Sequence, residues 1–339
     1  MHQSLRLHCQ TAALVGNYRA LQALSNVQVG AALKADAYGL GAVAVAERLL
    51  DAGCRDFFVS TWWEAAALRT LPEGSLAVLH GVGAEDEVIP GVRPVLISVE
   101  QVARWKAGPT PTAPVDVMVD TGMNRLGLSL DEVGSLAGLS IHTVHSHLAC
   151  ADVDHPLNRL QLERFSDIRA LVSAQRYSLA NSAGVFLGKE YAFDLVRPGL
   201  ALYGGIPRHE ARGQIGPVFE LEAQVLQSRK VGAGESVGYN ATFVAEQDLT
   251  VAILNLGYAD GYWRAFSSRG MARFEGQNLP VIGRVSMDLL AIDASGVPTL
   301  GEGDWVTLDF NLEAAARLTG YSQYELLTGL GRRLQRTWS

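Results

Sequence analysis

One lysine in the chain has the setting of a residue that reacts with aldehydes. Lys34 follows the apolar run at residues 29–33 and precedes a segment with glycines at positions 39 and 41. Such a position is typical of a side chain that a strand delivers to the rim of an active site. An amine removed from water is held neutral enough to attack a carbonyl carbon. We therefore predict a Schiff-base lysine, with a solvated lysine at a strand end as the alternative.

Further chemically capable side chains follow other apolar runs. Arg125 lies in a glycine-containing loop after residues 115–119, and His147 lies in the run 144–148. Asn181 and Ser182 follow residues 177–180, and Arg197 follows residues 195–196. Each residue alone is more typical of a surface charge or a hydrogen-bonded core residue. Because they all fall at equivalent ends of short runs, we expect them to face one cavity.

The elements that position these residues form a repeating pattern. Between residues 28 and 204, short apolar runs alternate with segments of helical spacing, which predicts parallel strands joined by helices. The runs lie at residues 29–33, 57–59, 76–79, 94–97, 115–119, 144–148, 177–180 and 195–196. Eight units predict an α/β fold of the closed (β/α)8 TIM-barrel type, with its site at the carboxyl ends of the strands. An open doubly wound sheet is the alternative.

The pattern changes after residue 205. Residues 219–226 largely alternate between apolar and polar, and further short strand-like runs lie at 249–256, 279–282, 289–292 and 305–310. Helices are predicted at residues 312–318 and 324–334. We therefore predict a barrel over residues 1–217 and a β-rich C-terminal domain over residues 218–339.

Composition and charge indicate which kinds of molecule the protein can bind. The chain has 339 residues, 48% hydrophobic content and a net charge of −7. The acidic balance disfavours nucleic acid and anionic membranes, and no apolar run approaches the ~20 residues of a membrane span. Cys9, Cys54 and Cys150 are too scattered for a disulfide framework or a metal cluster. We expect a cytoplasmic protein that acts on a small molecule and needs no metal.

Taken together, seven ordered motifs resemble the alanine racemases, which are pyridoxal-phosphate (PLP) enzymes of bacterial cell-wall metabolism. The motifs are KADAYG at 34–39, DTGMNRLG at 120–127, SHLA at 146–149, RPGLALYG at 197–204, VGYNATF at 237–243, LGYADG at 256–261 and GRVSMD at 283–288. They span nearly the whole chain.

The resemblance implies a set of roles. Lys34 is the PLP lysine, and the phosphate rests on Tyr38, Ser182 and the backbone N–H groups near Gly199 and Leu200. The other residues implied to bind the cofactor are Arg125 at the phenolate oxygen, Arg197 at the pyridine nitrogen, His147 between Arg197 and the second catalytic residue, and Asn181. The substrate-binding residues are Arg125, Tyr258 and Met287.

The implied reaction interconverts L-alanine and D-alanine and supplies D-alanine for peptidoglycan. Lys34 and Tyr239 then serve opposite faces of the substrate, with His147 and Arg197 as positively charged neighbours of the tyrosine. The family also implies a homodimer with shared active sites. The alternatives are a racemase of broader or serine specificity, a non-catalytic PLP-binding protein, and a metal-dependent amidohydrolase built on His145 and His147.

The chain departs from the family pattern at three places. Met118 stands where many members have a carbamylated lysine, Asn124 stands where glycine is usual, and residues 327–333 lack a phosphate-contacting tyrosine. A buried cation without a partner is costly. We therefore expect Arg125 to be partly desolvated and to hold an anion near Met118, with Asp116 or Asp120 as the alternative partner.

Overall fold

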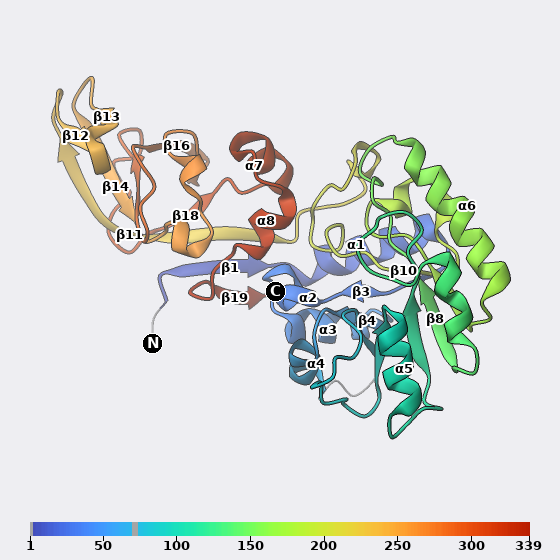
Figure 1. The fold of residues 1–339 in the computed structure, drawn as a ribbon. Helices are drawn as coiled ribbons and strands as arrows, with labels where there is room; N and C mark the ends of the chain where they lie inside the picture. Colours follow the sequence, from blue (N-terminus) through green and yellow to red (C-terminus); the bar gives the residue numbers. More distant parts are fainter. Residues whose placement is uncertain (1–2, 70–73) are drawn as a thin grey trace. The chain divides into compact units, whose positions relative to one another are not determined.

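The computed structural model describes residues 3–69 and 74–339 and divides the chain into two compact units (Figure 1). One unit spans Ala13–Gly216, and the other combines the segment up to Ala12 with Pro217–Ser339. The sequence analysis predicted a domain boundary one residue later than this one. It also predicted that the N-terminal segment belongs to the barrel. In the described residues, no helix has the length and apolarity needed to cross a membrane.

The first unit is built around a parallel sheet. Its seven-stranded part runs in chain order from β3 to β9, and β2 pairs with β10. The bounds are β2 (Gln28–Val29), β3 (Ala31–Ala32), β4 (Asp56–Val59), β5 (Ser75–Val78), β6 (Val92–Leu96), β7 (Val115–Met118), β8 (Ile141–His145), β9 (Arg176–Ser178) and β10 (Leu195–Val196). All eight predicted runs overlap these strands.

Hydrogen bonds around β10 close the sheet into a barrel. The Arg197 N–H donates to the Ala180 carbonyl at 2.9 Å, and the Ala32 N–H donates to the Pro198 carbonyl at 2.9 Å. The end of the sheet therefore joins its beginning, and β2 and β3 are two pieces of one strand. The prediction of a (β/α)8 barrel is confirmed, because closure excludes the open doubly wound sheet.

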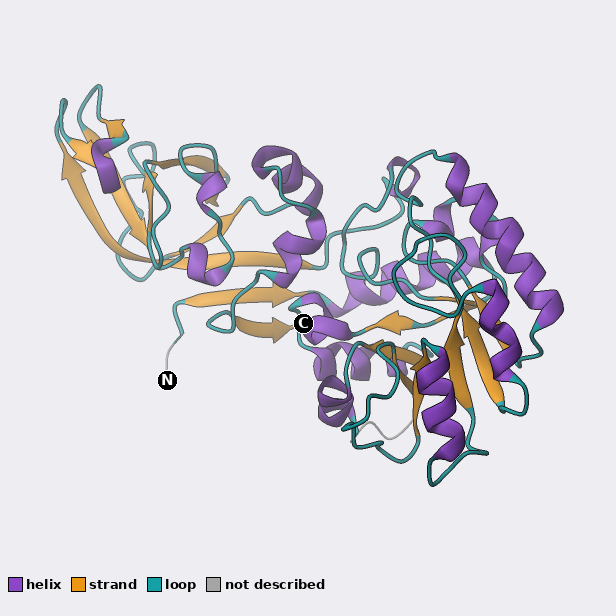
Figure 2. Cartoon of the chain, viewed as in Figure 1, coloured by secondary structure: helices purple, strands orange, loops and turns teal. Residues whose placement is uncertain are grey.

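Helices lie outside the strands, as Figure 2 shows in purple. They are α1 (Thr11–Ser25), α2 (Lys34–Tyr38), α3 (Ala42–Asp51), α4 (Trp62–Leu68), α5 (Val99–Ala107) and α6 (Pro156–Leu171). In α3 the buried residues Val45, Ala46 and Leu49 have helical spacing. In α6 the His155 side chain accepts a hydrogen bond from the Leu157 N–H, which fixes where that helix begins.

Side chains fill the barrel interior in an apolar layer. Phe58, Ala77, Val95, Met118 and Leu195 form one buried cluster, to which β4, β5, β6, β7 and β10 each contribute one residue. Strands of a barrel alternate inward and outward positions, so Asp116 faces the same interior two residues before Met118.

The second unit is a closed ring of antiparallel strands. Its 13-residue strand β11 (Phe219–Val231) pairs with β18 through its first half and with β14 through its second half. The ring continues from β14 through β17, β16 and β15 to β18. These strands are β14 (Leu249–Leu254), β15 (Met271–Phe274), β16 (Gln277–Ile282), β17 (Leu290–Asp293) and β18 (Trp305–Leu308). The prediction of a β-rich second domain is confirmed.

Two chain ends extend this sheet. The N-terminal strand β1 (Leu5–Cys9) pairs antiparallel with β11 and parallel with β19 (Gln335–Trp338). Helices α7 (Leu312–Thr319) and α8 (Gln323–Thr328) precede β19. The predicted helix at 324–334 was wrong in its second half, because α8 ends at Thr328 and the chain then turns into strand β19. A hairpin of β12 (Ser236–Val237) and β13 (Phe243–Val244) completes the unit.

Candidate active site

Lys34 opens a turn of left-handed helix. Within α2 the φ angles are positive at Ala35 (53°), Asp36 (54°), Ala37 (52°) and Tyr38 (56°). For residues with a Cβ, this conformation costs roughly 1–2 kcal/mol each, so the surroundings must hold it. The Ala35 N–H donates to Glu64 Oε1 at 2.7 Å, and the Ala42 N–H donates to Asp36 Oδ1 at 2.7 Å. The alanine-rich sequence would otherwise favour an ordinary right-handed helix.

The environment of Lys34 makes it a better nucleophile. Burial lowers the pKa of the Lys34 amine below its usual value, and the positive charges of Arg125 and Arg197 lower it further. The Glu64 carboxylate acts in the opposite direction. The amine is thus neutral more often than a surface lysine, as the predicted reaction with an aldehyde requires.

Tyr38, Ser182 and Gly199 form a cradle behind the lysine. The Ser182 hydroxyl oxygen accepts hydrogen bonds from the Gly199 N–H at 2.9 Å and the Ala201 N–H at 3.2 Å. A side chain at Gly199 is excluded, because its Cβ would lie 2.4 Å from the Tyr38 hydroxyl. The cradle follows the last two strands of the barrel and includes Leu200 beside Gly199, where barrels commonly bind phosphate. It fits the phosphate group of the cofactor that the resemblance implies.

Arg197 is buried, and the hydrogen bonds that it makes with the described residues go to neutral oxygens. Its Nη1 donates to the Ser178 carbonyl at 2.8 Å and to the Ser178 hydroxyl, and its Nη2 donates to the Ser146 carbonyl at 2.5 Å. Burial lowers the pKa of Arg197 to about 10. The guanidinium therefore stays positively charged at neutral pH and has a fixed orientation.

His147 is a neutral imidazole. Burial and the positive charges of Arg197, Arg125 and Lys34 lower its pKa to about 3. The Asn181 amide donates to His147 Nε2 at 3.4 Å, which joins two sequence-predicted residues. The lowered pKa disfavours the expectation that His147 itself contributes positive charge. The positive charge near the site comes from Arg197 and Arg125.

Arg125 and Met118 differ from the sequence expectation. The Arg125 side chain is exposed in the chain, and Met118 packs in the apolar cluster of the barrel interior. Asp120 Oδ1 accepts from the Gly122 and Met123 N–H groups at 2.8 and 2.9 Å, so it organises the loop. The expectation that Arg125 is a partly desolvated cation in need of an anion is therefore not met in the single chain. Asn124 keeps the backbone that favours glycine, with φ 55°.

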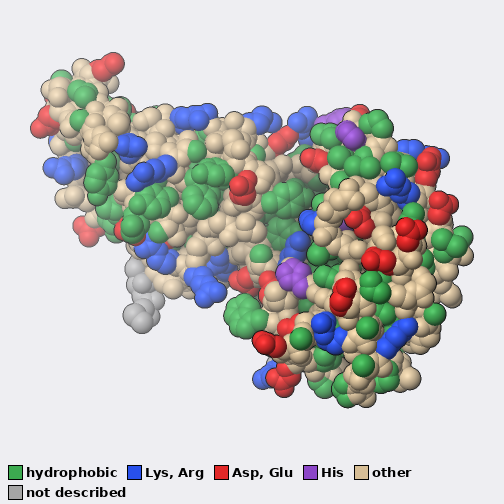
Figure 3. Space-filling view, in the orientation of Figure 1, with side chains coloured by type: hydrophobic (Ala, Val, Ile, Leu, Met, Phe, Trp, Pro, Cys, Tyr) green, Lys and Arg blue, Asp and Glu red, His purple; other side chains and the backbone are tan. Residues whose placement is uncertain are grey.

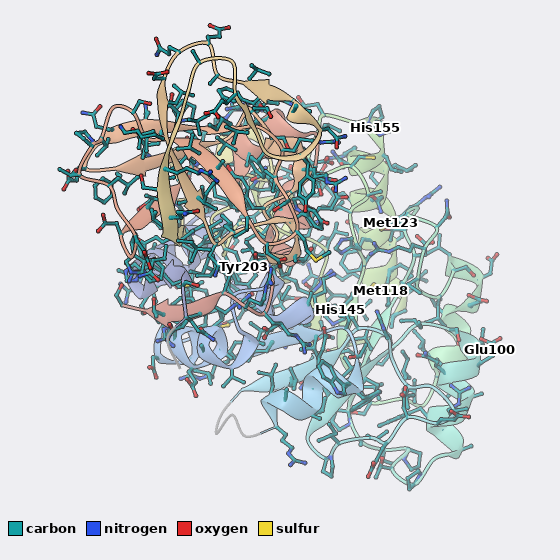
Figure 4. All side chains as sticks on the ribbon, turned by 90° about the vertical axis from the view of Figure 1, so that its left-hand side faces the viewer. Glu100, Met118, Met123, His145, His155 and Tyr203 are labelled. Carbon is teal, nitrogen blue, oxygen red and sulfur yellow. The ribbon has the colours of Figure 1, made fainter. Side chains whose placement is uncertain are left out.

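Asp116 and His145 form a buried pair on neighbouring strands. His145 Nε2 donates to Asp116 Oδ2 at 3.2 Å, and Arg93 Nε donates to Asp116 Oδ1 at 3.1 Å. Figure 4 labels His145 and Met118, which lie opposite each other in the β7–β8 register. Burial lowers the pKa of His145 to about 4. His145 and His147 thus have different hydrogen-bond partners, Asp116 and Asn181.

In the second unit, the predicted substrate loops lie side by side. The Tyr258 N–H donates to the Ser286 carbonyl, and the Ala259 N–H donates to the Met287 carbonyl, both at 3.0 Å. Met287 is 54% exposed. Tyr239, between β12 and β13, is 69% exposed.

Three supporting residues were missed by sequence reasoning. Glu64 bonds the Lys34 turn, Gln161 donates to the His147 carbonyl at 2.9 Å, and Arg333 binds Asp260 at 2.7 and 2.9 Å beside the Tyr258 loop. The spacing of Thr61 and Glu64 matches a capping box, so the position of Glu64 at a helix start could have been recognised from the sequence. Gln161 and Arg333 carry no such signal.

Comparison with known proteins assigns both units to one family. The family model described as alanine racemase, N-terminal domain, matches residues 9–207, and the model described as alanine racemase, C-terminal domain, matches residues 218–338. The alanine racemase of Acidiphilium cryptum is 42% identical over 96% of each chain. The catabolic alanine racemase of Agrobacterium fabrum is 42% identical over 96% of this chain and 90% of its own.

Solved structures agree with these matches. Alanine racemase from Bartonella henselae, crystallised with covalently bound pyridoxal phosphate, superimposes with a TM-score of 0.92 at 36% identity over all of both chains. The biosynthetic alanine racemase from Pseudomonas aeruginosa superimposes with a TM-score of 0.89 at 33% identity, also over all of both chains.

Proposed function

Because the chain belongs to the alanine racemase family, we infer that it interconverts L-alanine and D-alanine with pyridoxal phosphate as its cofactor. The observation that carries this function is the cluster around Lys34, in which an amine of lowered pKa lies beside the Tyr38–Ser182–Gly199 cradle. The family match disfavours the metal-dependent amidohydrolase. The presence of Tyr239, a candidate second base, favours an active enzyme over a non-catalytic PLP-binding protein.

Each residue of the cluster has a role in holding the cofactor. Lys34 would hold its aldehyde carbon, and Tyr38, Ser182 and the N–H groups at Gly199 and Leu200 would hold its phosphate. The ring would contact Arg125, His147, Asn181 and Arg197. When bound, the cofactor supplies an electron sink for the negative charge left when the alanine Cα loses its proton.

Two bases then account for inversion. Lys34 Nζ takes or returns the Cα proton on one face of the substrate, and Tyr239 Oη does so on the other. A phenol with an unperturbed pKa of ~10 is a poor base at neutral pH, so it needs a positive neighbour. Arg197, whose positive charge helps to lower the pKa of His147, would supply that charge. Arg125, Tyr258 and Met287 would bind the substrate.

Arg197 also favours racemisation over side reactions. With the cofactor bound, Arg197 would keep the pyridine nitrogen unprotonated, because a permanent cation disfavours a second positive charge close to it. The electron sink is then weaker. We propose that this limits competing reactions such as transamination.

The assignment is tested by product analysis. Purified protein supplied with PLP should acquire visible absorbance and convert either enantiomer of alanine to the racemic mixture, as measured by chiral chromatography. L-serine in the same assay tests the alternative of broader specificity, which predicts comparable rates for the two amino acids. Absence of D-alanine formation from L-alanine by the PLP-loaded protein would contradict the assignment.

We further propose a homodimer with shared active sites, which supplies D-alanine for peptidoglycan in the cytoplasm. Exposed apolar residues at Tyr239, Val244, Met287 and Leu289 of the second unit, and at Leu126 of the barrel, support an interface. Figure 3 shows hydrophobic side chains gathered on the visible face of the second unit. None of Cys9, Cys54 and Cys150 forms a disulfide in the part of the chain that the structure describes, as suits a reducing compartment.

Subunit mixing tests the shared sites. Inactive Lys34→Ala and inactive Tyr239→Phe subunits, once exchanged, should regain activity, because a two-fold interface rebuilds about one intact site in two in every mixed dimer. The control mixes Lys34→Ala with the double variant Lys34→Ala, Tyr239→Phe, which rebuilds no site. Verified exchange without recovered activity would show that each subunit works alone.

A further inference from the structure

The Glu64 carboxylate joins two elements at the point where Lys34 is presented. Its Oε2 accepts from the Ser60 N–H at 2.7 Å and the Thr61 N–H at 3.2 Å, at the start of α4. Its Oε1 accepts from the Ala35 N–H at 2.7 Å, directly after the lysine. One oxygen therefore completes the start of its own helix, and the other reaches a different strand-to-helix turn.

The bond to Ala35 is not needed for capping. In the equivalent capping box at α8, the carboxylate of Glu325 accepts from the N–H and the hydroxyl of Ser322, and these bonds stay at one helix start. In α4 the Thr61 hydroxyl likewise accepts from the Glu64 N–H at 3.2 Å. The contact from Glu64 Oε1 to Ala35 is thus an addition to an otherwise ordinary cap.

Ala35 is the first residue of the left-handed turn that ends at Tyr38. The local sequence does not favour the left-handed conformation. It therefore persists only where hydrogen bonds from residues outside the turn hold it. The turn carries Lys34 at one end and Tyr38, which covers Gly199, at the other. A fixed turn therefore sets the distance between the amine and the phosphate cradle.

The charge of Glu64 also acts on Lys34. The charged or titratable groups that act on or respond to Lys34 are Arg125 after β7, His147 after β8, Arg197 after β10 and Glu64 in α4. Of these, Glu64 is the one carboxylate. It opposes the two arginines and limits how far they depress the basicity of the lysine.

We propose that Glu64 is a positioning residue for the reaction: its carboxylate holds the left-handed turn that presents the Lys34 amine, and it balances the arginine charge around that amine. This proposal rests on the proposed function, in which Lys34 carries the cofactor.

The main test measures the lysine directly. In the full-length protein after removal of the cofactor, competitive labelling of amines across a pH series, read by mass spectrometry, gives the titration midpoint of Lys34. Lys106, Lys189 and Lys230 in the same chain serve as internal references. In Glu64→Gln, we expect the Lys34 midpoint to fall by about one pH unit, because the arginines are then unopposed.

A second readout uses the holoenzyme. We expect Glu64→Gln to release PLP about tenfold faster than the parent, since loss of a charge-assisted hydrogen bond loosens the turn. Glu64→Asp keeps the charge but is one methylene too short to span Ala35 and Ser60. It should therefore release PLP faster while leaving the Lys34 midpoint close to that of the parent, which separates geometry from charge.

Matched controls separate this role from helix capping. Thr61→Ala removes the hydroxyl of the same cap but leaves the bond from Glu64 to Ala35, and Glu325→Gln removes a capping carboxylate in the other unit. Both should leave the Lys34 midpoint and PLP release unchanged. The proposal is overturned if neither Glu64 variant differs from the parent in either readout, or if Thr61→Ala reproduces their effects.

A failure of the proposed function would be distinguishable from a failure of the Glu64 proposal. Borohydride reduction of the parent holoenzyme should attach the cofactor to Lys34. Attachment to another lysine would reject Lys34 as the cofactor residue whatever the Glu64 variants do.

Discussion

In a Lys34→Ala variant, we expect the visible absorbance of bound cofactor and the racemase activity to disappear together. The variant lacks both the amine that holds the cofactor and the base on one face of the substrate. Activity should fall by roughly 10⁴-fold or more, since a positioned base alone contributes 10²–10⁴. Absorbance spectra and chiral chromatography measure the two losses.

Lys106→Ala is the matched control for this prediction. Lys106 donates to the carbonyls of Ser135 and Ala137, each at 2.7 Å, on the outside of the barrel. Its removal should leave the spectrum and the rate unchanged. A Lys34→Ala protein that kept both cofactor absorbance and activity would remove the lysine from the mechanism.

The second large effect is expected for Tyr239→Phe. Loss of one hydroxyl removes the base on a single face, so exchange of the Cα proton with solvent should be suppressed about 10²–10⁴-fold more for one enantiomer of alanine than for the other. Proton exchange in deuterated water, followed by NMR for L-alanine and D-alanine separately, measures this asymmetry.

Tyr321→Phe offers a control, because Tyr321 is also a partly exposed tyrosine of the second unit (37%) and lies outside the candidate site. It should leave both exchange rates unchanged. If Tyr239→Phe suppressed exchange equally from the two enantiomers, the division of the faces between Lys34 and Tyr239 would be incorrect.

The barrel and its site residues were predictable because each depends on a local pattern. Apolar runs mark strands, and a polar residue after a run lies at the carboxyl edge of the sheet. This reasoning brought Lys34, His147, Asn181 and Arg197 into one cluster, and the structure places them on consecutive parts of one barrel.

Properties that arise from distant contacts were not predictable. Nothing in residues 34–38 signals a left-handed turn, because its conformation depends on Glu64, 29 residues away. The lowered pKa of His147 depends on its burial in the folded barrel and on charged side chains from three other segments. The strand at 335–338 was not predicted, because its partner β1 lies at the opposite end of the sequence.

The pairing of β1 with β11 and β19 also sets the order in which the chain can fold during synthesis. Residues 13–216 are contiguous, so the barrel can close while later residues are still being made. The sheet that carries the Tyr239 hairpin cannot be completed then, because Arg6 pairs with Gln335. One edge of β1 can pair with β11 once residues 219–223 have been made, but its other edge stays unpaired until residues 335–338 follow. A nascent chain would thus hold an assembled cofactor cradle before the sheet of the second unit is complete, and the open edge of β1 would be a site for wrong pairing with other chains.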